Sequence, residues 1–136
     1  PMKAQTIATA IKIGNPVNRK KAIRSLEWTN GVVEFVTDQQ IMDAKALIDA
    51  AGIGCEPASA CSLAGTRKLV EAGIIQPGDT VAGVLTGHVL KDPDATIGYH
   101  SNQLEDIAPQ HPNKLLQAGD DIEQIVGLLA PERELV

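Results

Sequence analysis

The sequence predicts an α/β fold with a mostly parallel sheet and flanking helices. Segments with a strand pattern alternate with segments of helical periodicity along the chain. The residues available for a core are mostly Ala, Val, Ile and Leu, the usual filling of a buried parallel sheet, and the only aromatic residues are Trp28, Phe35 and Tyr99. A helical bundle could use the same side chains, so composition only favours the sheet.

Short strands are predicted in four segments, which are residues 6–13, 32–36, 80–85 and, inside a polar stretch, 114–116. The first alternates β-branched with small residues and ends at a Gly-Asn-Pro turn signal. The third is a nearly continuous apolar run, typical of a strand buried on both faces.

Helices are predicted in the intervening segments, over residues 16–28, 37–51, 57–73 and 120–130. The first and third open with a proline, whose missing N–H costs no hydrogen bond in the first turn. The second opens with Thr-Asp-Gln-Gln, the pattern of a capping box, and continues with apolar residues at helical spacing. Asp120 or Asp121 is expected to cap the last helix.

We expect residues 1–136 to form a single α/β domain. Its core is assigned to residues 1–92, followed by a polar loop region over 93–119 and the terminal helix over 120–130. The loop assignment is based on the prevalence of polar residues and prolines between the last buried strand and the last helix.

The composition argues against several classes of function. The net charge is −5 and no basic stripe could displace phosphate counterions, so no nucleic-acid partner is expected. No apolar run approaches the roughly 20 residues that span a bilayer, so no membrane partner is expected. Cys55 and Cys61 lack the spacing of zinc ligands, so no metal site is predicted. Two reduced thiols and the lack of an apolar leader predict a cytoplasmic protein.

Three motifs, in this order, resemble those of the threonine synthase family. They are Thr-Ile-Ala-Thr-Ala-Ile-Lys-Ile-Gly-Asn-Pro at 6–16, Glu-Pro-Ala-Ser-Ala at 56–60, and Gly-Asp-Thr-Val at 78–81 running into Val-Leu-Thr-Gly-His at 84–88. The resemblance extends from about residue 6 to residue 93. The second motif occurs across the wider tryptophan-synthase-β-like group, whereas the first and third together are more specific.

The resemblance implies the C-terminal portion of a fold-type-II pyridoxal-phosphate enzyme. Such a lyase converts O-phospho-L-homoserine and water to L-threonine and phosphate. The family's cofactor-binding lysine and its glycine-rich phosphate loop would lie upstream, and neither motif occurs in this chain. We therefore expect the chain to be inactive alone, with no catalytic residue of its own. Its expected partner is the missing N-terminal half or a second copy of the chain.

Thr86 is the first predicted cofactor-binding residue. It follows a predicted buried strand, and ligands of parallel sheets bind at that end. The resemblance implies that its hydroxyl meets the pyridine nitrogen of the cofactor, which a hydroxyl leaves largely neutral. From the pattern alone, the alternative is a threonine at a strand end that bonds only to backbone.

Glu56 is the second predicted cofactor-binding residue. By resemblance, residues 56–59 lie close to the cofactor ring as supporting groups. The alternative is purely structural, because a carboxylate is favoured at any helix start by the helix dipole. Residues 8–14 are either a backbone wall beside the ring or a plain edge strand. His88 is expected to anchor its loop more often than to act as a general base.

Two other functions remain open at this stage. A serine or threonine dehydratase would share the fold, but those enzymes typically carry a Ser-Gly-Gly type of motif where this chain has Thr-Gly-His. The other open function is that of a non-catalytic module that binds a partner or a second copy of itself. Half of a larger protein should expose apolar surface, and such surface usually recruits a partner.

Overall fold

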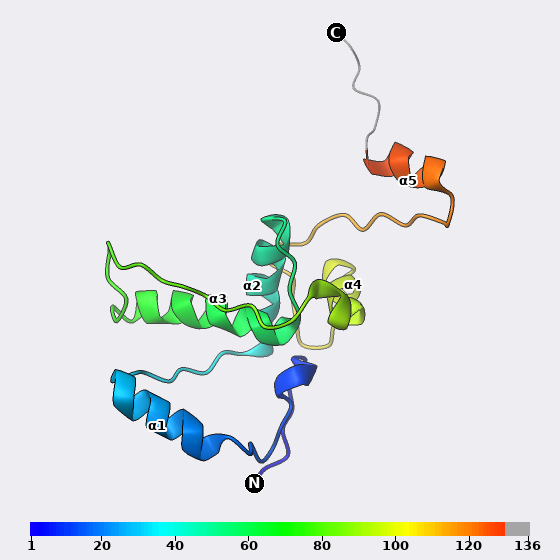
Figure 1. The fold of residues 1–136 in the computed structure, drawn as a ribbon. Helices are drawn as coiled ribbons and strands as arrows, with labels where there is room; N and C mark the ends of the chain where they lie inside the picture. Colours follow the sequence, from blue (N-terminus) through cyan, green and yellow to red (C-terminus); the bar gives the residue numbers. More distant parts are fainter. Residues whose placement is uncertain (130–136) are drawn as a thin grey trace.

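The computed structural model describes residues 1–129, and within that range its regular elements are all helical (Figure 1). In chain order they are η1 (Thr9–Ile11), α1 (Arg19–Thr29), α2 (Asp38–Ala50), α3 (Pro57–Glu71), η2 (Val89–Lys91), α4 (Pro93–His100) and α5 (Ile122–Leu129). None of the helices in this range is both long and apolar enough to cross a membrane.

The prediction of a mostly parallel sheet is wrong, because residues 1–129 contain no β-strand. Part of the first predicted strand, 6–13, is the 3₁₀ helix η1, and the segments 32–36, 80–85 and 114–116 form no hydrogen-bonded ladder. Alternating β-branched residues favour an extended backbone, but a strand also needs a neighbouring chain to pair its N–H and C=O groups.

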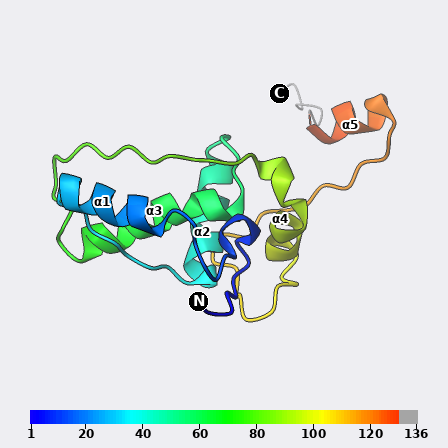
Figure 2. The ribbon, with the colours of Figure 1, turned by 60° about the horizontal axis from the view of Figure 1, so that its bottom comes forward.

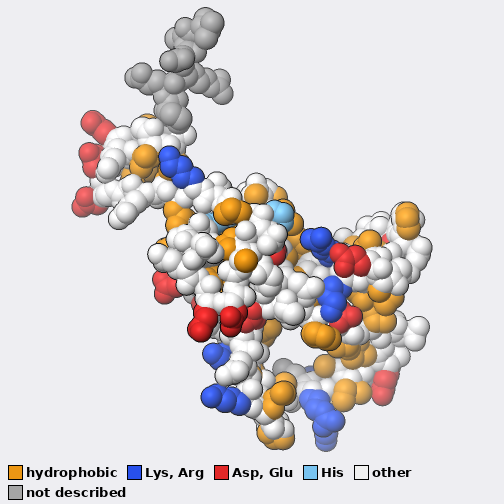
Figure 3. Space-filling model, turned by 180° about the vertical axis from the view of Figure 1, so that it is seen from behind, with side chains coloured by type: hydrophobic (Ala, Val, Ile, Leu, Met, Phe, Trp, Pro, Cys, Tyr) orange, Lys and Arg blue, Asp and Glu red, His pale blue; other side chains and the backbone are white. Residues whose placement is uncertain are grey.

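The side chains of these unpaired segments lie largely in solvent. Val33 and Phe35 are each 75% exposed and Val84 is 72% exposed. Further apolar side chains are open on the face seen in Figure 3. The apolar run 80–85, which has the composition of a strand buried on both faces, is therefore not buried in this structure.

Helix α2 begins with the predicted capping box. The hydroxyl of Thr37 accepts the N–H of Gln40 at 3.3 Å, and the Gln40 side chain accepts the N–H of Thr37 at 3.0 Å. This arrangement satisfies backbone donors that would otherwise be free at the first turn. The prediction of this helix start is confirmed at the level of single atoms.

Helix α2 is the centre of the packing because it buries two faces. The face toward α3 contributes Ile41, Ala44 and Ile48, which pack with Ala60 and Ala64 of α3. The other face contributes Met42 and Ala46, and these pack with Ala95, Tyr99 and Ile107 around α4. Figures 1 and 2 show α2 between the other two helices.

Helix α3 begins as predicted, with Pro57 in its first turn. It reaches Glu71, and the following Gly73 adopts a left-handed φ of 70°, which ends the helix at little steric cost. The residues that face α2 are small alanines, so the two helices can approach closely.

Helix α4 corrects the prediction of a polar loop over 93–119. Prolines such as Pro93 are typical of turns, which is why a loop is expected here. A proline is equally suited to the first turn of a helix, and Pro93 occupies that place in α4. Tyr99 of α4 is 1% exposed, and its hydroxyl donates to Asp43 Oδ1 at 2.5 Å. The hydroxyl oxygen of Tyr99 accepts the N–H groups of Gln110 and His111, each at 3.1 Å. Tyr99 therefore ties the following loop to α2.

The first and last α-helices contribute little to this core. None of the residues in α1 or α5 is buried, and α5 lies apart from the other helices in both ribbon views (Figures 1 and 2). Helix α1 begins at Arg19, later than the predicted start at residue 16. Asp121 Oδ1 accepts the N–H of Glu123 at the start of α5, and residue 130 of that predicted helix lies outside the described residues.

A buried ion pair stabilises the C-terminal half of α2. Lys45 is 1% exposed, and its Nζ lies 2.5 Å from Asp49 Oδ2. The other oxygen of Asp49 accepts the N–H of Cys55 at 3.1 Å. The carboxylate thus neutralises a buried cation and also holds the turn that leads into α3.

We predict that Lys45→Ala lowers the free energy of unfolding by about 2–3 kcal/mol, because it leaves the Asp49 carboxylate without its cation. The value lies at the low end for a broken buried pair, since Asp49 is 17% exposed. Urea unfolding followed by circular dichroism at helical wavelengths measures it.

The chain offers a matched control for this variant in Arg67→Ala. Arg67 and Glu71 are also an i,i+4 pair, at 3.0 Å, but their side chains are 71% and 61% exposed. An exposed pair of this kind contributes about 0.5 kcal/mol or less. Equal losses in the two variants would contradict the assignment of a stabilising buried pair.

Tyr99 should also make the free energy of unfolding depend on pH in the alkaline range. Burial, and then the hydrogen bond to Asp43, raise the pKa of Tyr99 above its ordinary value of 10.0. The neutral phenol is therefore favoured in the folded state. Its contribution is complete below about pH 10 and is lost as the pH rises through the folded-state pKa.

We predict that the free energy of unfolding falls more steeply above about pH 10 in the wild type than in Tyr99→Phe. At neutral pH the variant should be less stable by about 1–3 kcal/mol, because the His111 N–H loses its acceptor and the Gln110 N–H keeps only Asp43 Oδ1. The two proteins differ only at residue 99, so the difference between the two curves isolates Tyr99. Parallel curves would refute this assignment.

Candidate functional site

Two segments that the sequence analysis singled out come together at the N-terminus of α3. The N–H of Glu56 donates to the carbonyl of Gly87 at 3.0 Å. The hydroxyl of Ser59 accepts the N–H groups of Thr86 and Gly87, each at 2.9 Å. Three hydrogen bonds therefore hold residues 86–87 against the first turn of the helix.

Thr86 is open to solvent on one side and held by buried groups on the other. The residue is exposed, whereas Glu56 and Ser59 are each 2% exposed. The Thr86 hydroxyl lies 3.2 Å from the Ser59 hydroxyl and 3.5 Å from Glu56 Oε1. A ligand can thus reach Thr86 without breaking the buried contacts behind it.

Glu56 is a buried carboxylate with one cation beside it. The residue occupies the N-cap position of α3, but its side chain makes no capping hydrogen bond. Lys91 Nζ lies 3.0 Å from Glu56 Oε2 as an ion pair. The orientation is not that of a hydrogen bond, so this buried oxygen has no hydrogen-bond donor within residues 1–129. The positive end of the helix dipole also favours the carboxylate.

Gly87 lies against the carboxylate of Glu56. A Cβ atom built on Gly87 would overlap the Glu56 carboxylate. Gly83, in the same segment, has room, since its Cβ would lie 3.6 Å from the Ser62 hydroxyl. A side chain at position 87 would therefore displace the carboxylate from both Thr86 and Lys91.

The segment 8–14 begins beside this site. Ala8 is fully buried and packs in the same cluster as Cys55 and Ala60, at the start of α3. The next residue, Thr9, donates its hydroxyl hydrogen to Asp92 Oδ2 at 2.7 Å. The alternative of a plain edge strand is wrong here, because residues 9–11 form η1. The first motif of the sequence is thus held near the second and third.

His88 and Cys55 take structural roles in this geometry. The Nδ1 atom of His88 accepts the N–H of Leu90 at 3.2 Å, so the ring anchors its loop as expected. Burial is the main cause that raises the pKa of the Cys55 thiol; the charge of Lys45 lowers this pKa, and the charges of Asp49 and Glu56 raise it further. Burial thus disfavours the reactive thiolate form of Cys55.

Ser59 lies in the stretch 56–59 that was expected to support the cofactor ring, but no role of its own was predicted. Gly87 was predicted only as part of a motif, and Lys91 was not predicted as part of the site. The preference for serine near helix starts could have drawn attention to Ser59. No local signal pairs Lys91 with Glu56, because the two are brought together only by the path of the chain.

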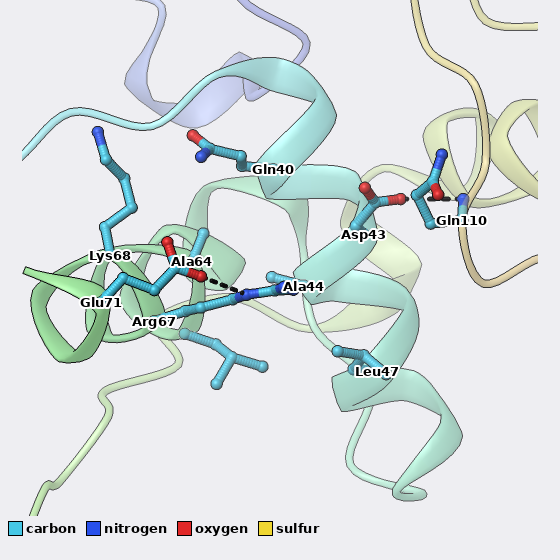
Figure 4. Close-up of a pocket in the computed structure, with 10 residues that line it drawn as sticks. Gln40, Asp43, Ala44, Leu47, Ala64, Arg67, Lys68, Glu71 and Gln110 are labelled. Atoms are coloured by element: carbon cyan, nitrogen blue, oxygen red, sulfur yellow. Dashed lines mark hydrogen bonds and ion pairs between the residues drawn. The ribbon is translucent and has the colours of Figure 1, made fainter.

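A hollow in the surface lies elsewhere, between α2 and α3 (Figure 4). It has a volume of about 330 Å³, and its floor includes Ala44 and Leu47. Arg67 at its rim is paired with Glu71. None of the predicted site residues lines this hollow.

Comparison with known proteins gives a consistent set of relatives. The chain is 52% identical over 94 residues to threonine synthase of Methanosarcina acetivorans, which covers 68% of this chain and 23% of that protein. It is 46% identical over 122 residues to threonine synthase of Bacillus sp. (strain ULM1), covering 89% and 32%. It is 38% identical over 109 residues to threonine synthase 2, chloroplastic, of Arabidopsis thaliana, covering 79% and 21%.

The chain therefore spans only a fifth to a third of the length of these relatives. The sequence model of a family described as pyridoxal-phosphate dependent enzymes matches residues 1–87. That match includes the start of α3 and ends at Gly87, so it contains Glu56, Ser59 and Thr86. On this basis the chain belongs to the family of pyridoxal-phosphate dependent enzymes.

Proposed function

We propose that the chain is the part of a threonine synthase that contacts the pyridine ring of pyridoxal phosphate. The complete enzyme converts O-phospho-L-homoserine and water to L-threonine and phosphate. The proposal extends to this chain the activity named in relatives of 38–52% identity. The two free thiols agree with a reducing compartment, so a cytoplasmic location is part of the proposal.

The observation that carries the proposal is the placement of Thr86. The residue is exposed, and its hydroxyl lies against the buried Ser59 and Glu56. A hydroxyl is both a donor and an acceptor, so it can bind an aromatic ring nitrogen in either protonation state. The bound cofactor supplies the electron sink for the reaction, and Thr86 would hold its ring nitrogen.

Glu56 would act as a supporting group with a charge balanced within this chain. Its carboxylate lies against Thr86 on one side and is paired with Lys91 on the other. A lysine engaged in this way is a poor candidate to bind the cofactor covalently. We assign the covalent lysine and the phosphate-binding loop to the remainder of the enzyme.

We also propose that the remainder of the enzyme covers the exposed apolar side chains of this chain. Trp28 is 77% exposed, and Val33, Phe35 and Val84 are exposed to a similar degree. Apolar groups gathered on unpaired segments usually mark an interaction surface. The relatives contain more than enough additional chain to form that cover. A second copy of this chain is the competing occupant.

A chimera tests the proposed role of Thr86. The aligned segment of the M. acetivorans enzyme is replaced by the corresponding residues of this chain, and phosphate release from O-phospho-L-homoserine is measured. We predict that the chimera is active and that Thr86→Val lowers kcat/KM at least about tenfold, equivalent to about 1.4 kcal/mol. The valine keeps the shape of the side chain but removes the hydroxyl.

Thr86→Ser is the matched control, because it keeps the hydroxyl and should retain most of the activity. An active chimera that tolerates Thr86→Val would refute the assigned contact. Release of ammonia from serine or threonine, without release of phosphate from O-phospho-L-homoserine, would instead indicate a dehydratase.

The chain alone provides a second test. With pyridoxal phosphate it should give no visible absorbance band that borohydride fixes to a lysine. A band fixed on one specific lysine would show that this portion binds the cofactor covalently. It would then contradict the division of roles between the two parts of the enzyme.

A further inference from the structure

We propose that Ser59 is a positioning residue that fixes the direction of the Thr86 hydroxyl, so that Thr86 donates its hydrogen to an unprotonated ring nitrogen. This inference rests on the proposed contact between Thr86 and the cofactor. It adds the residue that orients the contact.

Ser59 has a limited capacity to accept hydrogen bonds. A serine hydroxyl has one donor hydrogen and two acceptor lone pairs. The N–H groups of Thr86 and Gly87, each 2.9 Å from Ser59 Oγ, occupy both lone pairs. Ser59 therefore cannot also accept a hydrogen bond from the Thr86 hydroxyl.

The hydrogen of Ser59 has one acceptor within reach in the described part of the chain. Thr86 Oγ1 lies 3.2 Å away, and Ser59 makes no other side-chain contact in which it could be the donor. Ser59 is 2% exposed, so bulk water does not compete for this hydrogen. The distance alone leaves the direction of the bond open, but the count of lone pairs makes Ser59 the donor.

This direction determines what Thr86 can offer a ligand. Its oxygen accepts from Ser59, so its own hydrogen is free to donate. Within residues 1–129, the one protein acceptor near it is Glu56 Oε1 at 3.5 Å, the limit of a hydrogen bond. The other oxygen of Glu56 is paired with Lys91 at 3.0 Å. A ring nitrogen with a free lone pair would replace a long bond with a better one.

A protonated ring nitrogen is less well matched to this arrangement. Thr86 would have to accept its N–H through the remaining lone pair and send its own hydrogen along the long path to Glu56. Lys91 neutralises the Glu56 carboxylate, so this carboxylate attracts a positive charge on the ring less strongly. Ser59 thus favours the neutral ring through the hydroxyl that it orients.

Neutron diffraction of the deuterated chain tests the direction of the bond without any cofactor. The expected result is a deuteron on Ser59 Oγ that points to Thr86 Oγ1. A deuteron on Thr86 Oγ1 that points to Ser59 would overturn the inference. Neither result depends on whether the complete enzyme is a threonine synthase.

The consequence for the ring is tested in the chimera loaded with pyridoxal phosphate labelled with ¹⁵N in the ring. We predict a nitrogen resonance at the position of unprotonated pyridine in the parent chimera. In Ser59→Ala it should move toward the position of protonated pyridine. Ser59→Thr, which keeps the hydroxyl, should restore the parent value.

The Thr86 and Gly87 N–H groups provide the control for folding in these variants. Their amide signals should shift in Ser59→Ala, while those of α2 stay in place. A ring resonance that is unchanged in a folded Ser59→Ala chimera would refute the positioning role. If Thr86→Val does not lower the activity of the chimera, while the deuteron lies on Ser59 Oγ as expected, the failure lies in the proposed function.

Discussion

The structure depends on the burial of two faces of α2. One face packs on α3 and the other on the region of α4, so this helix connects both hydrophobic clusters. Polar bonds reinforce both contacts, with Asp49 holding the turn into α3 and Asp43 holding Tyr99. Because residues 1–129 contain no strand, no sheet shares this task. The N-terminus of α3, and with it the candidate site, is positioned by that packing.

The site illustrates how a buried polar group can prepare an exposed one. Ser59 and Glu56 are nearly inaccessible, yet they determine the surroundings of the Thr86 hydroxyl at the surface. A threonine held only by its own backbone could rotate its hydroxyl freely. Here, the two N–H groups that Ser59 accepts also keep residues 86–87 in place, so the same hydroxyl supports both the backbone and the side chain.

Local signals predicted the helices well and the sheet badly. The capping box of α2 and the proline that opens α3 act over a few residues, so they could be interpreted from the sequence. The same proline signal at Pro93 was taken for a turn, which left α4 unpredicted. Extended segments such as 80–85 have the composition of buried strands, but pairing requires a partner that the local pattern does not contain.

The sequence by itself determined the family, because the three motifs are contiguous runs whose identity does not depend on how they are packed. It also determined where α2 and α3 begin, and it pointed to Glu56 and Thr86 as the residues of interest. Only the tertiary structure decided that Ser59 contacts Thr86, that Gly87 lies against the Glu56 carboxylate and that Lys91 pairs with Glu56. These contacts join residues far apart in the chain, and their geometry follows from the packing of α2 and α3 rather than from any local preference.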